Sequence, residues 1–189
     1  MTKFAFFTAM TLLSMSFVAS IVQHSSSKTP TECNINWSPT ERLQWSDFKG
    51  RPESGSPAVA MTHSGFQTFP TNEKIGDRTY VRTKVVAQFD CHESWVRSSE
   101  KNNDYALKHE QGHFDISEIF ARKLAKELNK RPISVYSYNE IMGNTYDRIF
   151  SEMSDFQIRY DNETRHSLDR PKQAQWNQLI AEQLAAKEQ

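Results

Sequence analysis

The stretch HEQGHFD, residues 109–115, places two histidines four positions apart with a glutamate between them. On a helix, His109 and His113 lie within about 40° of each other and one turn apart. Glu110 lies about 100° around the helix, beside the pair. Two imidazoles in this arrangement bind one zinc ion, while the carboxylate between them reaches a water molecule. The pattern predicts a zinc-binding catalytic helix.

The alternative is a helix that carries two histidines without a metal. Ile116, Phe120 and Leu124 fall on the same side as the histidines, so the histidine face is also the buried face. Two buried imidazoles without a metal would each need a hydrogen-bond partner. The pattern therefore favours the metal site.

A catalytic zinc needs a third protein ligand. Asp115 and Glu118 are close in sequence, but on the helix they point about 240° and 180° away from His109, so neither can bind the same metal. We expect them to be solvated, or to lie outside the ligands of the metal. His63 and His92 lie in or beside an expected β-hairpin, where polar side chains usually face solvent. His166 is therefore the first candidate.

His166 ends the segment YDNETRHS, where the chain turns back after a second expected helix. If that helix packs antiparallel to the histidine helix, the turn brings His166, or else Asp161 or Glu163, over the metal. Tyr160 then donates a hydrogen bond to a developing oxyanion. The alternative for Tyr160 is that it ends the apolar stripe of its helix.

The elements that must position these residues follow from periodicity. Residues 78–91 alternate as a strand does, and with residues 58–69 they predict a hairpin around a loop at 70–77. Helical patterns follow from about 103 to 128, from about 139 to 160, and from about 171 onward. Asn102 or Asn103 can cap the first helix. The sequence predicts an α+β fold in a single domain, residues 34–189.

The N-terminus predicts export. Lys3 precedes an uncharged, mostly apolar run, and small residues at 18–20 suit signal-peptide cleavage after Ser20. The alternative is an uncleaved membrane anchor, which would be the chain's only membrane contact. Residues 21–33 read as a flexible leader. Either interpretation places the domain outside the cytoplasm, in the periplasm or secreted.

The chain has two cysteines, Cys33 and Cys91. In an exported protein an even pair predicts a disulfide bond, and the alternative is two unpaired thiols.

Composition narrows the class of partner. The chain has 23 basic and 23 acidic residues, so its formal net charge is zero. No basic stripe is present that would follow a phosphate backbone, so we expect no nucleic-acid partner. Nothing in the sequence indicates the oligomeric state.

Several segments resemble, in the same order, a bacterial family called "domain of unknown function 922". They are LQWSDFKG, AMTHSGF, LKHEQGHFDISEIFARKL, and YDNETRHS with QAQWNQLI. The family's description includes Zn-dependent protease activity and the zincin-like superfamily. The resemblance implies a zincin-like fold, with His109 and His113 as ligands and Glu110 as catalytic base. It also supports His166 as the third ligand.

The resulting hypothesis is an exported hydrolase that binds Zn2+ and cleaves peptide bonds in a peptide or protein substrate. Glu110 takes a proton from the attacking water and passes it to the leaving amine. The alternative is a non-catalytic exported module whose zinc site is structural, or an envelope scaffold that binds no metal. The intact Glu110 argues against a purely structural site.

Overall fold

One long hairpin forms the main sheet. The computed structural model describes residues 33–186, and in it β3 (Ser64–Ile75) pairs antiparallel with β4 (Arg78–Asp90) along its whole length. The opposite edge of β4 pairs with two short strands, one near each end: β1 (Asn34–Asn36) and β6 (Ile133–Ser134). A separate two-stranded sheet consists of β2 (Ala60–Met61) and β5 (Trp95–Val96).

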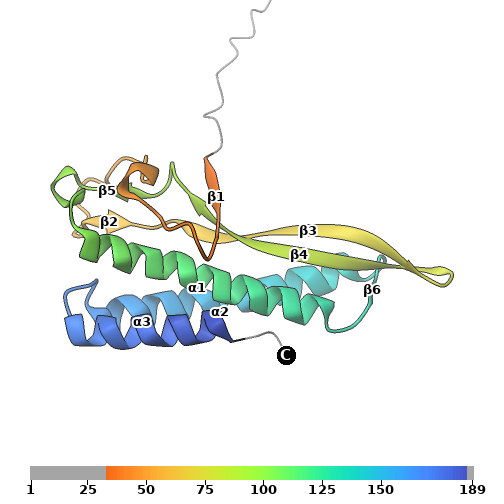
Figure 1. Cartoon of the computed structure of the whole chain (residues 1–189). Coiled ribbons are helices and arrows are strands. Elements are labelled where there is room, and N and C mark those ends of the chain that lie inside the picture. Colours follow the sequence, from red (N-terminus) through yellow and green to blue (C-terminus); the bar gives the residue numbers. More distant parts are fainter. Residues whose placement is uncertain (1–32, 187–189) are drawn as a thin grey trace, which may run out of the picture. The chain divides into compact units, whose positions relative to one another are not determined.

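Three helices complete the fold, and α1 (Asp104–Asn129) is the central one (Figure 1). The sheet lies on one side of α1, and α2 (Tyr138–Thr164) and α3 (Arg170–Ala185) lie on the other. Two short 3-10 helices, η1 (Trp45–Asp47) and η2 (Ser98–Glu100), lie in the connections. The histidine helix is therefore enclosed from both sides.

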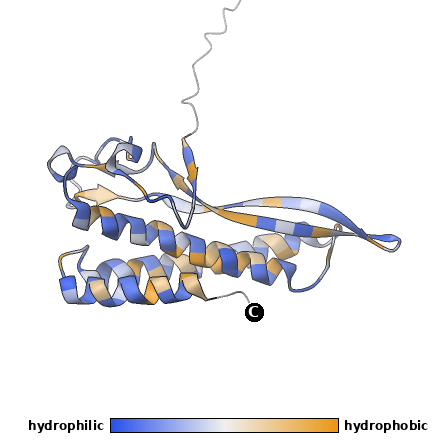
Figure 2. Cartoon of the chain, in the orientation of Figure 1, coloured by the Kyte–Doolittle hydropathy of each residue, from blue (hydrophilic) through white to orange (hydrophobic). Residues whose placement is uncertain are grey.

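The hydrophobic core follows from this layering. Phe89 of β4 packs against Phe114 of α1, and Phe120 of α1 packs against Phe156 of α2. Hydrophobic residues mark β4 where it passes over α1, whereas the end of the hairpin is largely hydrophilic (Figure 2). Burial of the inner face of α1 is what fixes the direction of its histidines.

The predicted α+β class and the hairpin are confirmed, but the predicted loop at 70–77 is wrong. The strands stay paired up to Ile75 and Arg78, and the turn is Gly76–Asp77, with Gly76 at a positive φ of 61°. The stretch 58–69 is not one strand either. It breaks between β2 and β3, because the Thr62 side chain contacts α1 and the His63 amide donates to Ser94 Oγ.

The predicted helices are confirmed, with one extension. Asn103 caps α1 through its side chain, and Asp169 caps α3 with Pro171 in the first turn. Helix α2 continues to Thr164, four residues beyond the predicted end at Tyr160. This extension makes Asp161 a helical residue, and its side chain then projects from α2 toward α1.

The N-terminal predictions lie almost entirely outside the described residues. The signal peptide at 1–20 and the leader up to residue 32 are not described, and residues 33–186 form one compact unit. Within these residues, no helix combines the length and apolar character needed to cross a membrane.

The predicted disulfide between Cys33 and Cys91 is present. It joins the residue before β1 to the residue after β4, next to the point where the two strands pair. A disulfide of this kind is typical of proteins in an oxidising compartment.

The disulfide closes a loop with a sequence separation of 58 residues. We therefore expect a Cys33→Ser/Cys91→Ser double variant to lose about 4 kcal/mol of unfolding free energy, because its unfolded chain is less constrained. Denaturant unfolding of both proteins checks this. Reductant should lower the stability of the parent and leave the double variant unchanged; equal stability of parent and variant would contradict the prediction.

Candidate metal centre

The two histidines of α1 direct their Nε2 atoms at the same point. His109 Nε2 lies 3.1 Å and His113 Nε2 3.0 Å from one oxygen, Asp161 Oδ1 of α2. His109 is 4% exposed, and its ring stacks on that of Tyr160. The antiparallel packing of α2 on α1, on which the placement of a third ligand depended, brings Asp161 to this position (Figure 1).

Of the candidates for a third ligand, Asp161 lies closest to the histidine pair. The ligand atoms of His109, His113 and Asp161 all lie within 4.8 Å of one another. His166 reaches the same carboxylate, with Nδ1 3.5 Å from Asp161 Oδ1, but its side chain is 71% exposed. Glu163 points elsewhere and accepts a hydrogen bond from Trp176.

Glu110 lies beside the histidine pair and is buried. Its Oε2 accepts a hydrogen bond of 2.7 Å from the Thr62 hydroxyl, which comes from the break between β2 and β3. The Glu110 side chain lines a cavity of about 170 Å³ together with both histidines, Asp161 and His166. The segment 58–62 forms the wall of the cavity opposite α1.

Tyr160 does not offer its hydroxyl to this cavity. The side chain is fully buried, and the hydroxyl donates to the His109 carbonyl oxygen at 3.1 Å and accepts from Gln173 Nε2 at 2.7 Å. Burial raises the pKa of Tyr160 well above its usual range, and the charges of Glu110 and Asp161 add to the effect. These contacts favour Tyr160 as the end of the apolar stripe and give no support to the oxyanion role.

A glycine on α1 makes room for Tyr160. A Cβ atom at Gly112 would lie 2.3 Å from the Tyr160 hydroxyl oxygen and 2.9 Å from ring carbon Cζ, closer than real contacts allow. The tyrosine ring therefore reaches the backbone of α1 only because residue 112 has no side chain.

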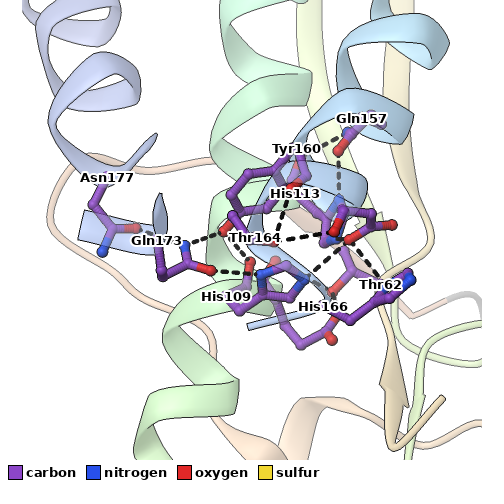
Figure 3. A network of polar contacts seen from close by, with 11 residues as sticks. Thr62, His109, His113, Gln157, Tyr160, Thr164, His166, Gln173 and Asn177 are labelled. Carbon is purple, nitrogen blue, oxygen red and sulfur yellow. Dashed lines mark hydrogen bonds and ion pairs between the residues drawn. The ribbon is translucent and has the colours of Figure 1, made fainter. Parts of the chain in front are cut away.

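Three residues of the site were missed by the sequence prediction. Gln157 Oε1 lies 2.5 Å from His113 Nδ1, and Gln173 Oε1 lies 2.8 Å from His109 Nδ1. Thr62 holds Glu110, as described above. Figure 3 shows the two glutamines and the threonine arranged around the histidine pair.

The charges of His113 and Asp161 stabilise each other, and this shifts the pKa of both groups. Burial lowers the pKa of His113, but the hydrogen bond and charge of Asp161, with the charge of Glu110, outweigh it and raise the pKa to about 9. Burial likewise raises the pKa of Asp161, and the hydrogen bonds with His109 and His113 reverse this and hold it well below its usual range. The metal-free cluster thus attracts a proton to His113.

The remaining candidates lie away from the cavity. Asp115 is buried on another side of α1, where it accepts hydrogen bonds from Trp37, Arg42 and Gln111. Of the two roles expected for it, a solvated or an outer group, the solvated one is wrong. Glu118 pairs with Arg122 one turn along the same helix. Neither His63 nor His92 lines the cavity that holds the histidine pair.

The donor set fits a metal ion such as zinc. Two imidazole nitrogens and a carboxylate oxygen are typical zinc ligands. Both imidazoles face the same carboxylate oxygen, where hydrogens on Nε2 would donate to it and where a cation would take the place of those hydrogens. His109, His113 and Asp161 would hold that cation.

Comparison with known proteins agrees with the resemblance drawn from the motifs. Residues 31–167 match the model of a family described as "Bacterial protein of unknown function (DUF922)". The chain belongs to the DUF922 family. The match ends before α3, so the QAQWNQLI segment lies beyond it. Neither a curated protein nor a solved structure matches the chain.

The interaction between His113 and Asp161 predicts that the stability of the metal-free protein depends on pH. In the folded protein the pKa of His113 is about 9, above the ordinary histidine value of 6.5. The protonated His113 therefore stabilises the folded state fully below pH 6.5, and this contribution to the unfolding free energy is lost as the pH rises through 9. We expect the unfolding free energy of the chelator-treated protein to fall across this interval, as denaturant unfolding would measure.

The matched control is Asp161→Asn, which removes the charged partner of His113 and keeps the size of the side chain. Its unfolding free energy should change much less over the same pH interval. A parent and variant with the same pH profile would show that the pair does not stabilise the fold.

Proposed function

We propose that this protein is an exported zinc-dependent peptidase with a zincin-like active site. The observation that carries the proposal is the convergence of His109 Nε2, His113 Nε2 and Asp161 Oδ1 beside the buried carboxylate of Glu110. All four side chains line one cavity. A metal site with a carboxylate next to it, and not among its ligands, is the arrangement that hydrolysis by an HExxH helix requires.

His109, His113 and Asp161 hold the metal. When bound, zinc polarises a carbonyl group and lowers the pKa of a water molecule to near neutrality. His166 lies at the rim and reaches Asp161 from the exposed side. The proposal thus gives the role of third ligand, predicted for His166, to Asp161, one of the two acids that the sequence offered as alternatives.

Glu110 acts as the general base. Its carboxylate takes the proton of the attacking water and passes that proton to the leaving amine when the peptide bond breaks. The Thr62 hydroxyl holds Oε2 in place, which keeps the carboxylate against the cavity. Burial between β2 and α1 limits its contact with bulk water.

The substrate is a peptide or protein in the envelope or outside the cell. The signal-like N-terminus and the Cys33–Cys91 disulfide both support an exported location, periplasmic or secreted. The absence of a basic stripe from the sequence argues against a nucleic-acid substrate.

One observation favours a second candidate, a non-catalytic zinc module. His166 Nδ1 lies 3.5 Å from Asp161 Oδ1, so a small movement of the turn would add a fourth ligand. A site closed by four protein ligands leaves no position for water and is structural. The buried Glu110 favours the peptidase, because a structural site has no use for a base.

Metal content tests the ligand set. We expect about one zinc ion per chain in the parent protein, lost in His109→Ala, His113→Ala and Asp161→Ala because each removes one of three ligands. His166→Ala should keep its zinc, as should the control His63→Ala. Loss of zinc from His166→Ala with retention in Asp161→Ala would restore His166 as third ligand, and a metal-free parent after zinc loading would contradict the proposal.

Hydrolysis tests the base. Glu110→Gln should keep its zinc and cleave a peptide library at least about 100-fold more slowly than the parent, because the amide cannot accept the proton. Glu118→Gln, on the same helix but paired with Arg122, is the matched control and should keep the parent rate. Full activity in Glu110→Gln would rule out this base, and a zinc-loaded parent that cleaves nothing would favour the structural module.

A further inference from the structure

The hydrogen bonds of Gln157 determine where the proton of His113 lies. Gln157 Nε2 is 3.0 Å from the carbonyl oxygen of His113. A carbonyl oxygen only accepts, so the amide nitrogen must face it, and Oε1 then faces His113 Nδ1. Because an amide oxygen also only accepts, Nδ1 carries a hydrogen and donates it to Gln157.

The same reasoning applies to His109 through a longer chain of bonds. The Tyr160 hydroxyl donates to the His109 carbonyl oxygen and therefore accepts from Gln173 Nε2. The same Gln173 nitrogen donates to Asn177 Oδ1 at 3.0 Å. Gln173 Oε1 is thus left facing His109 Nδ1, which must donate to it. Gln173 is 1% exposed, so water cannot replace it.

A neutral imidazole has a single N–H, and a hydrogen on Nδ1 leaves the lone pair on Nε2. We infer that Gln157 and Gln173 are positioning residues, which hold both histidines with hydrogen on Nδ1 so that both Nε2 lone pairs face the metal position beside Asp161. The inference rests on the zinc site proposed above. Figure 3 shows the two glutamines on opposite sides of the histidine pair.

The two glutamines act on the metal in the same way but from different helices. Gln157 lies on α2 and serves His113, whereas Gln173 lies on α3 and serves His109. Hydrogen-bond acceptors behind a ligating histidine fix its ring and make it a stronger ligand, and removing one lowers metal affinity 10- to 100-fold. Helix α3, beyond the residues that match the family model, is therefore part of the metal centre.

Four variants of the full protein test the inference. Gln157→Met and Gln173→Met remove the acceptor and keep the length of the side chain. Gln157→Glu keeps an acceptor oxygen for Nδ1 but loses the donor to the His113 carbonyl oxygen. Gln178→Met is the matched control, because Gln178 lies exposed on α3 and bonds only with Glu182 among the contacts described. Zinc affinity is measured by competition with a chelator, and the imidazole N–H signals by 15N NMR.

We expect zinc affinity to fall 10- to 100-fold in Gln157→Met and in Gln173→Met, to fall less in Gln157→Glu than in Gln157→Met, and to stay at the parent value in Gln178→Met. The NMR signals should separate the two glutamines. Gln157→Met should remove the slowly exchanging Nδ1–H signal of His113 and leave that of His109, and Gln173→Met should do the reverse.

Unchanged zinc affinity in both methionine variants would overturn the inference. So would the loss of both Nδ1–H signals in each variant, because general loosening of the helices would then explain the effect. A parent that binds no zinc would contradict the proposed function, but the positioning role of the glutamines could still be tested in that protein. Nδ1–H signals from both histidines would support the positioning role. Neutral rings protonated only on Nε2 would overturn it.

Discussion

Two imidazole nitrogens lie 3.1 Å and 3.0 Å from one carboxylate oxygen, and the rest of the site is arranged around this shared contact, which either hydrogens on the nitrogens or a bound cation can satisfy. In the metal-free protein the hydrogen bond and charge of Asp161 raise the pKa of His113 despite its burial, so this imidazole holds a proton. Zinc replaces that proton in the proposed function, so proton and metal compete for one place. The packing around the site keeps these three side chains together at one cavity.

Helix α1 is held from several sides so that its histidines cannot turn away. On one side Asp115 binds Arg42 and Trp37, and Gln111 accepts the Leu43 amide at 2.7 Å, which ties the segment after β1 to the helix. On the histidine side, Tyr160 reaches the backbone over Gly112 and stacks on one imidazole. These contacts prevent α1 from rotating about its axis, so its histidines need not be reordered when a metal ion binds. Such rigidity is what a preorganised metal site requires.

The HExxH spacing was enough to place His109, His113 and Glu110 on one cavity, because helical geometry alone determines which side chains are neighbours. Periodicity predicted that α2 ends at Tyr160, because the apolar stripe stops there and Asp161 resembles the start of a polar loop. The glutamines were missed for a related reason: a polar residue on an amphipathic helix usually faces solvent. A signal was present for Gln173, which shares the helix face of Trp176 and Ile180 and is buried with them. No local pattern links Thr62 to Glu110, since only the tertiary fold brings them together.

The turn between α2 and α3 explains why Asp161 and Gln173, twelve positions apart, contact the same histidine. Arg165, His166 and Ser167 all adopt positive φ, at 50°, 51° and 70°, which costs about 1–2 kcal/mol per residue for side chains other than glycine. Backbone bonds from His166 to Asp161 and from Asp169 to Thr164 offset this strain. The turn joins the end of α2 to the start of α3, and the carboxylate and the glutamine reach the same histidine from these two helix ends. Strain at a functional site is retained when the surrounding structure imposes it, and here it brings α3 against His109 and leaves the side chain of His166 at the rim of the cavity.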